Sequence, residues 1–271
     1  MTRTLWVREV QTQDLPLVSA WLTPGMDTAL PAGDAETNEQ WLVAVRSDDK
    51  TAGAETGGHG GGGGQPLACL RLRRAIGLDL PRHWYHVGCV VHAAAELGLV
   101  HRLHTLQLGN DLTGASEIAD VAWDHAALDL PTSATVLRQL LGAALQRLAS
   151  DRPGHAARLI VELPGLRDAD GQSPFWQGLG HHFYDGDPAA AALKFGPAWR
   201  SHVAALLPRQ PVYTDFLCDA AQSAVAQVDP AARVLMDLLW QAGLRYAHHV
   251  CIDDGGPVFE CATDLVVAPV A

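Results

Sequence analysis

The sequence predicts a mixed α/β fold, in which strands and helices alternate as far as about residue 185. Two segments carry this prediction. From Thr132 to Ser150, apolar residues recur at helical spacing and form one stripe. The run ARLIVELPG at 157–165 is continuously apolar and bounded by turn residues, which is typical of a central buried strand. The expected core is a strand–helix–strand–helix unit.

Further strands are expected where short apolar or alternating segments lie between turn residues. They are predicted at 4–10, 41–46, 66–77, 87–95, 104–111, 116–123, 245–253 and 257–267. The turn Asp254-Gly255-Gly256 predicts that the last two strands form a hairpin. Further helices are predicted at 11–22, 197–208, 219–230 and 232–243, with a short helix that begins at Ser173.

A glycine-rich segment, residues 47–66, separates two of the predicted strands. It has almost no apolar side chain that could offset the entropy of ordering, so we interpret it as a flexible hairpin loop. A phosphate-binding glycine loop is disfavoured, because such a loop leads from a strand into a helix. Here the residues that follow, PLACLRLRRAIG, predict another strand.

Composition limits the partners of the chain. Its 271 residues carry a net charge of −11 and no basic run, which excludes nucleic acid as an expected partner. No apolar run approaches membrane-spanning length, and the N-terminus lacks the apolar region of a signal peptide. The five cysteines form no Cys-x-x-Cys pair, which favours a reducing compartment. The expected location is the cytoplasm.

Five segments together resemble the arginine N-succinyltransferase family, in the family's order along nearly the whole chain. They are Gly25 to Pro31, Val87 to Glu117, Asp168 to Asp187, Leu206 to Leu217 and Ala226 to Cys261. The resemblance implies a GCN5-related acyl-CoA N-acyltransferase-like fold with a family-specific C-terminal half. We expect residues 1–185 to form the acyltransferase-like domain, and residues 186–271 to form a helical and hairpin region packed on it.

The resemblance also implies a reaction. Such enzymes transfer a succinyl group from succinyl-CoA, a co-substrate, to the α-amino group of arginine in arginine catabolism. Some relatives work as paired, non-identical subunits, so a homodimer or a heterodimer with a related subunit is expected. Members of the family continue for a further C-terminal segment, and by that measure this chain is short.

A cofactor site is implied along the predicted strand 116–123. The fold holds pantetheine like an added strand against a splayed central strand, and holds the pyrophosphate on N–H groups of the loop that opens the next helix. The family's succinyl-CoA contact falls at Val121, beside Asp120. A backbone contact does not depend on side-chain identity, so Val121 can make it. The alternative is an ordinary core valine.

The helix-opening loop departs from the family pattern. Family members carry basic and glycine residues there, whereas this chain reads HAALDLPTSAT. Pro131 lacks an N–H, and Asp129 adds negative charge where an anion should bind. The hydroxyl groups of Thr132 and Ser133 are the remaining cofactor-binding candidates. The alternative is that both residues only cap the helix.

A second departure concerns proton transfer. The family places a histidine, assigned as proton donor, between Gln-Val and Pro, and this chain has Asp229 before Pro230. With an ordinary pKa near ~3.9, Asp229 would be ionised at neutral pH and could act as a base or pair with an ammonium group. The alternative is an N-cap for the next helix.

Four polar residues are candidates for substrate binding. Asn110, Asp111 and Glu117 belong to a polar turn that leads into the strand 116–123, and they form either an active-site wall or a capped loop. Glu162 lies in an apolar run, so it is either a substrate carboxylate or half of an internal pair. The histidine pairs lack cysteine or acidic partners at metal-site spacing, so no metal is predicted.

Two functions are consistent with these residues. The first is an enzyme in which the amine attacks the thioester directly, because no paired nucleophile and base indicates a covalent intermediate. The second is a catalytically impaired homologue that acts as the non-catalytic partner subunit of an arginine or ornithine succinyltransferase. The enzyme is the first prediction, and the two departures at functional positions together with the short C-terminal end are the reasons for keeping the second function as the alternative.

Overall fold

A single ten-stranded sheet organises the chain. The computed structural model describes residues 4–22, 38–47 and 64–265. The strand order is β1-β2-β3-β6-β7-β10-β9-β4-β5-β8, and among these strands β6 and β7 are the parallel neighbours. The strands are β1 Leu5–Glu9, β2 Glu39–Ser47, β3 Gly64–Arg73, β4 Trp84–Ala94, β5 Leu99–Gly109, β6 Ser116–Trp123, β7 Arg158–Glu162, β8 Val212–Tyr213, β9 Arg245–Cys251 and β10 Pro257–Ala262.

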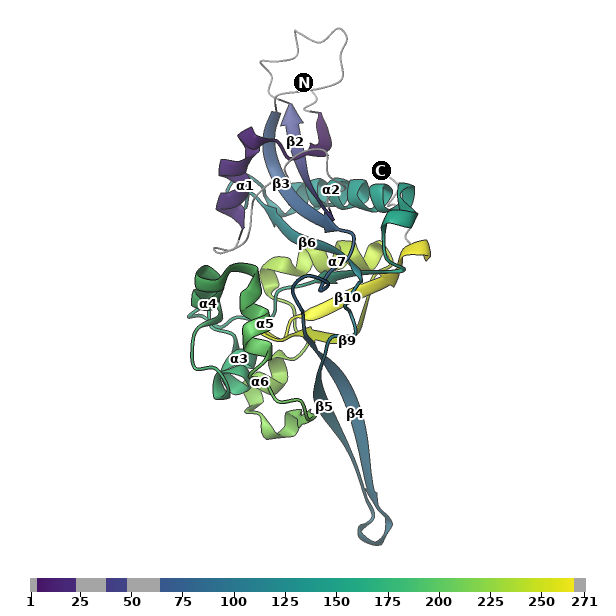
Figure 1. Ribbon diagram of the computed structural model, residues 1–271, viewed down its shortest axis with the longest axis vertical. Coiled ribbons are helices and arrows are strands. Elements are labelled where there is room, and N and C mark those ends of the chain that lie inside the picture. The colour runs from purple at the N-terminus through teal and green to yellow at the C-terminus, as the bar shows by residue number, and fades with distance from the viewer. Residues whose placement is uncertain (1–3, 23–37, 48–63, 266–271) are drawn as a thin grey trace.

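Helices lie beside this sheet in two groups (Figure 1). Within the described ranges, no helix is long and apolar enough to cross a membrane. The helices are α1 Leu15–Trp21, α2 Leu130–Ser150, α3 Pro174–Gly178, α4 Pro188–Phe195, α5 Trp199–Ala204, α6 Asp219–Ala224 and α7 Arg233–Gln241. One group is α2 with α7, and the other is α3 to α6, which gather beside the base of the β4–β5 hairpin (Figure 1). Helix α1 lies apart from both groups and packs on β2 and β3.

The apolar stripe of α2 forms the larger core. Leu140 and Leu148 of α2 are fully buried against Ile118 of β6 and Leu159 of β7, and α7 completes this cluster. Burial of one such side chain contributes about 1.5–3 kcal/mol. A second core, centred on Trp176, lies between α3 to α6 and strands β4, β5 and β9. The mixed α/β architecture that the sequence predicts is confirmed.

The two central strands separate soon after they meet. β6 and β7 pair only at Ser116–Leu159 and Glu117–Ile160. β6 then continues beside β3 as far as Trp123, and its residues 119–122 are only half-buried. The edge of β6 that faced β7 is therefore left without a strand partner among the described residues.

A β-bulge bends β6 at this point. The register of β6 with β3 shifts between Cys69 and Arg71. Opposite the shift, Asp120 has a φ of +54°, a left-handed conformation that is strained for a residue other than glycine. The Asp120 carboxylate forms an ion pair with Arg71 that holds this conformation.

Several predicted boundaries change in the structure. The helix expected at 219–230 ends at Ala224, because Ala226 has a φ of +59° and turns the chain so that Val228 bridges Gly165 beyond β7. The last strand ends at Ala262 rather than at residue 267. Helix α4 was not predicted, because its alanine-rich run has no apolar–polar contrast.

The remaining sequence predictions have three different outcomes. The C-terminal hairpin is confirmed as β9 and β10. β2 and β3 form the expected antiparallel pair, while most of the glycine-rich loop between them and the segment 25–31 lie outside the described residues. The division at residue 185 stays a prediction; β9 and β10 lie within the sheet, between β7 and β4.

Candidate active site

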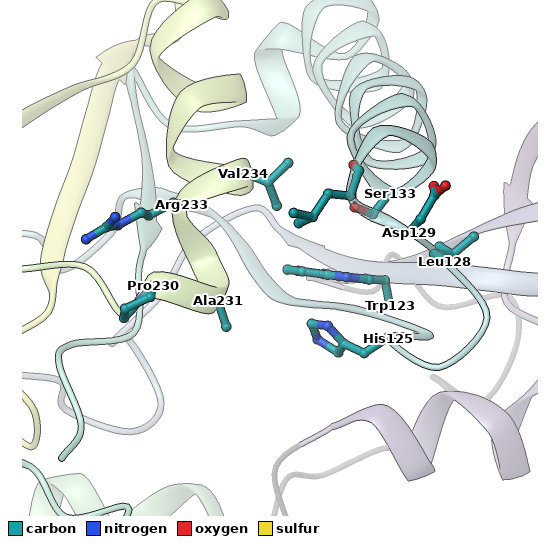
Figure 2. Close-up of a pocket in the computed structure, with 10 residues that line it drawn as sticks. Trp123, His125, Leu128, Asp129, Ser133, Pro230, Ala231, Arg233 and Val234 are labelled. Atoms are coloured by element: carbon teal, nitrogen blue, oxygen red, sulfur yellow. Dashed lines mark hydrogen bonds between the residues drawn. The ribbon is translucent and has the colours of Figure 1, made fainter. Parts of the chain in front are cut away.

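A cleft of about 520 Å³ lies where β6 has left β7 (Figure 2). Its walls come from the end of β6, the start of α2 and the start of α7. The lining residues are Trp123, His125, Leu128, Asp129, Leu130, Ser133, Pro230, Ala231, Arg233 and Val234. The cleft is thus at the helix-opening loop where the resemblance implies the cofactor.

The start of α2 forms one wall of the cleft. Asp129 is the N-cap, and its Oδ1 accepts a 2.9 Å hydrogen bond from the N–H of Thr132. Hydrogen bonds from the Thr132 side chain and N–H lower the pKa of the Asp129 carboxyl, so the cap is an anion. Thr132 is exposed, whereas Ser133 is buried and its Oγ donates to the Leu130 carbonyl at 2.9 Å.

Two aromatic rings lie in the same cleft. The centroids of Trp123 and His125 are 4.4 Å apart, with the rings tilted by 41°. Figure 2 shows both rings between the starts of α2 and α7. Sequence reasoning missed this pair, although an aromatic residue at the end of the predicted central strand was a usable signal. Planar aromatic rings of this kind can stack on a base or contact a pantetheine chain.

The start of α7 forms the facing wall. The N–H of Asp229 donates to the Pro164 carbonyl at 2.9 Å, just beyond β7. Asp229 Oδ1 accepts from the N–H of Ala231 at 2.9 Å, so Asp229 caps the short turn that leads into α7. Its Oδ2 makes no hydrogen bond to any described residue. Arg233 also lines the cleft, but its guanidinium points away from Trp123 (Figure 2).

A charged network covers the opposite face of β6 and β7. Arg82 donates to Glu117 at the start of β6 at 2.8 Å, and to Glu162 at the end of β7 at 2.6 Å. Trp84 Nε1 donates to the same oxygen of Glu162 at 2.6 Å. Arg82 therefore ties together the two strands at the point from which they separate.

Further ion pairs extend this network in both directions. Arg200 contacts Glu162 at 2.7 Å and Asp253 at 3.0 Å. Arg73 pairs with Glu117 at 2.9 Å, with Glu39 at 3.0 Å and with Asp120 at 3.9 Å. Arg71 pairs with Glu39 at 3.1 Å and with Asp120. We call these nine residues the charged network; it holds five carboxylates and four guanidinium groups.

The network keeps its central carboxylates ionised. Burial would raise the pKa of the Glu162 carboxyl, but Arg82 and Arg200 hold it well below its usual range. Burial opposes ionisation of Glu117 too, and there Arg82 and Arg73 lower the pKa. At Asp120 burial prevails over Arg71 and Arg73 and raises the pKa. Glu117, Asp120 and Glu162, which are all predicted site residues, thus have arginine partners inside the protein.

The remaining candidates lie at the edges of these two regions. Val121 is half-buried, and its side chain packs against the α2 core. Asp111 is exposed and its Oδ2 is 2.8 Å from Nε2 of His249. Asn110 is also exposed, and its carbonyl accepts from the N–H of Thr113 at 2.9 Å. The structure thus divides the predicted site residues between the cleft and the charged face of the sheet.

One cluster has donor atoms at metal-binding distances. Sγ of Cys251 and carboxylate oxygens of Asp253 and Asp254 lie within 4.8 Å of one another. Both oxygens of Asp254 accept backbone N–H groups, from Gly165 and Gly256. Asp253 faces the cation Arg200. Among the described residues, Oδ1 of Asp253 is the one carboxylate oxygen of the pair without a hydrogen-bond partner, and burial raises the pKa of the Cys251 thiol. One free oxygen and a protonated thiol are too few ligands to support a metal site.

Comparisons with known proteins show which family this chain belongs to. Residues 63–268 match the family model described as arginine N-succinyltransferase beta subunit. The arginine N-succinyltransferase of Salmonella typhimurium is 33% identical over 256 residues, which cover 94% of this chain and 70% of that protein. The chain belongs to the arginine N-succinyltransferase family. The enzyme of the same name from Salmonella enteritidis matches with the same identity and coverage.

A solved structure has the same fold. The arginine/ornithine succinyltransferase subunit AI from Pseudomonas aeruginosa superposes with a TM-score of 0.72 and 23% identity, over 98% of this chain and 78% of that one. Membership of the arginine N-succinyltransferase family and this shared fold confirm the resemblance. They also make the chain a member of an acyltransferase family.

Proposed function

We propose that this protein transfers the succinyl group of succinyl-CoA to the α-amino group of arginine. One observation carries the proposal: β6 and β7 pair at only two positions and then separate beside the cleft at the start of α2. An open strand edge next to a helix start provides hydrogen-bonding groups for the pantetheine part of CoA and a binding place for the CoA pyrophosphate. The family relationship supplies the identity of the acyl donor and acceptor.

The acyl-CoA would lie along β6 and across the cleft. The half-buried stretch 119–122, which includes Asp120 and Val121, offers its backbone to the pantetheine. At the start of α2, Thr132 and Ser133 are the candidates for phosphate contact. Ser133 lines the cleft, and both hydroxyl groups would exchange their present acceptors, the Asp129 carboxylate and the Leu130 carbonyl, for the phosphate. The tilted pair Trp123 and His125 offers a surface for the adenine or the pantetheine stem.

The arginine substrate would bind at the charged face, with its α-amino group directed into the gap where β6 and β7 separate, so that it reaches the thioester. The charged network has one more carboxylate than guanidinium groups, so a cation is favoured there. Asn110 and Asp111, both exposed in the loop before β6, are candidates for direct contact. Glu117 and Glu162 are paired with Arg82 and would shape this region of the substrate site from beneath.

The reaction removes two protons from the nitrogen of arginine. The α-ammonium group releases the first, and the neutral amine attacks the thioester carbonyl; a C–N bond forms, the C–S bond breaks, and the second proton, lost from the nitrogen as the amide forms, ends on the CoA thiolate. Asp229 occupies the family's proton-donor position at the edge of the cleft, and its Oδ2 is unpartnered within the described ranges. We assign it the role of base that accepts the ammonium proton and passes it on.

The partner-subunit function is less favoured. The described cleft keeps its aromatic wall and open strand edge, and the relatives named as enzymes align with 94% of the chain. We place the reaction in the cytoplasm, since all five cysteines are unpaired thiols.

Substitution of Asp229 tests the proposed role. Asp229→Asn keeps an N-cap but removes the base, so we expect kcat to fall about 100- to 10,000-fold while the calorimetric affinity for succinyl-CoA stays the same. Asp229→His restores the family residue and should retain turnover. The matched control is Asp187→Asn, which alters the N-cap of α4 away from the cleft. Absence of succinyl-CoA binding at millimolar concentration would overturn the proposal that this protein is an enzyme.

A further inference from the structure

The bulge of β6 lies on the strand edge along which the proposed function places the pantetheine. Two consecutive residues of β6, Asp120 and Val121, oppose the single residue Leu70 of β3. The pairs on either side of them are Cys69–Ala122 and Arg71–Ala119. The pairing of β6 with β7 has already ended at Glu117. The conformation of the bulge therefore decides how the backbone of this open edge is directed.

Asp120 occupies the bulge position that glycine usually takes. Its φ is +54°, and the first residue of a bulge of this kind is typically a glycine in the left-handed conformation. For other L-residues this conformation costs roughly a factor of ten in the conformational equilibrium, although aspartate visits it more readily than most. The bulge therefore needs a contact that offsets this cost.

Arg71 of β3 provides that contact. Its Nε and Nη2 both contact Oδ2 of Asp120, and each of the two side chains is only 5% exposed. The guanidinium is also fixed from β2, since it lies 4.8 Å from the centre of the Trp41 ring and 3.1 Å from a carboxylate oxygen of Glu39. Arg71 thus gives the Asp120 carboxylate a fixed anchor inside the sheet.

The part of Asp120 that faces solvent is its backbone. The residue as a whole is half-buried although its side chain is almost fully buried, so the exposed atoms belong mainly to the main chain. The Asp120 carboxylate is therefore turned toward Arg71 and away from a ligand on the open edge. A ligand that binds there would meet backbone groups whose direction depends on the ion pair.

We propose that Arg71 is a positioning residue for the acyl donor, which acts through Asp120 by keeping the bulge of β6 in its left-handed conformation. This inference rests on the proposed succinyl-CoA site along β6. Without the ion pair, a smaller fraction of the molecules has the bulged conformation, and the apparent affinity falls by that fraction. Arg71 itself contacts no substrate in this arrangement.

Two substitutions of Asp120 separate backbone conformation from charge. Asp120→Gly and Asp120→Ala remove the same carboxylate, but only glycine adopts a positive φ without cost. We expect calorimetric titration of the full chain with succinyl-CoA to give about tenfold tighter binding for Asp120→Gly than for Asp120→Ala. Equal affinities of these two variants would overturn the proposal.

Substitution of Arg71 in two backgrounds tests the residue itself. Arg71→Met should weaken succinyl-CoA binding about tenfold when residue 120 is aspartate, but no more than about twofold in the Asp120→Gly background. A direct attraction between Arg71 and the anionic ligand would give the same loss in both backgrounds, and that result would contradict the positioning role. In turnover assays of Arg71→Met, the KM for succinyl-CoA should rise while kcat stays the same, because saturating acyl donor restores the bulged conformation.

A matched control measures the effect of losing a buried ion pair elsewhere. Arg8→Met breaks the ion pair of Arg8 with Asp14, which β2 and β3 separate from β6, so it should lower the melting temperature without changing the affinity for succinyl-CoA. Circular dichroism checks that each variant folds; if Arg71→Met does not fold, the two Asp120 variants still decide. A wild type that binds no succinyl-CoA would overturn the proposed function together with this inference. A wild type that binds it, with Arg71→Met equal in affinity, would overturn the positioning role alone.

Discussion

Arg82 determines more of the site than any residue singled out from the sequence. It joins Glu117 of β6 to Glu162 of β7 through hydrogen bonds of 2.8 and 2.6 Å. The sequence left two alternatives for Glu162, a substrate carboxylate or half of an internal pair. In the structure its carboxylate contacts Arg82, Arg200 and Trp84. Nothing in the chain near residue 162 indicates these partners, because they come from residues about 40 to 80 positions away.

Removal of Arg82 should therefore cost much of the stability of the fold. Arg82→Met removes the cation shared by the buried Glu117 and the half-buried Glu162, which keep only Arg73 and Arg200 as partners. We expect the free energy of unfolding in urea to fall by about 3 kcal/mol, the low end of the cost of breaking a buried ion pair. Arg74→Met is the control, because its ion pair with Asp151 is exposed on both sides and should contribute no more than about 1 kcal/mol. Equal, small losses in both variants would contradict the buried role of Arg82.

The start of α2 shows how one helix end serves both folding and the cleft. The sequence predicts the helix from its periodicity, and the structure begins it at Leu130, two residues earlier than expected. The early start makes Asp129 the cap and brings Ser133 into the cleft wall. The periodic interior was predictable because apolar spacing is local. The position of the end depended on a cap that competes with other polar residues.

Asp129 places a negative charge beside the expected phosphate position. Asp129→Ser keeps a good N-cap and removes that charge, so we expect the KM for succinyl-CoA to fall several-fold with an unchanged melting temperature. Asp124→Ser is the control, since Asp124 caps the preceding turn but does not line the cleft. An unchanged KM in Asp129→Ser would show that the phosphates bind elsewhere.

At the scale of the whole molecule, the sheet decides which thiols meet solvent. Cys89 lies on β4 beyond its pairing with β9, Cys218 precedes α6, and both are exposed, whereas Cys69 and Cys251 lie inside the sheet. Burial raises the pKa of the Cys69 thiol to about 12 and that of the partly buried Cys261 thiol to about 11. The five cysteines therefore differ widely in reactivity.

Native labelling with a thiol reagent should reflect this arrangement. We expect Cys89 and Cys218 to react rapidly, Cys261 slowly, and Cys69 and Cys251 only after unfolding. Peptide mass spectrometry identifies the labelled sites, and a sample in concentrated urea, where all five react, is the reference. Rapid native labelling of Cys69 would mean that the β2–β3–β6 part of the sheet opens in solution.

The sequence by itself determined the class of the fold, most of its strands and helices, and the family, because periodicity and motif order are written along the chain. Only the tertiary structure decided where β6 leaves β7, which arginines satisfy Glu117 and Glu162, and that the turn after Asp229, residues 230 and 231, lines the same cleft as Ser133. It also decided that Arg71 and Asp120, 49 positions apart, meet at the bulge of β6. Each of these depends on contacts between residues distant in sequence, and local pattern carries no record of such contacts.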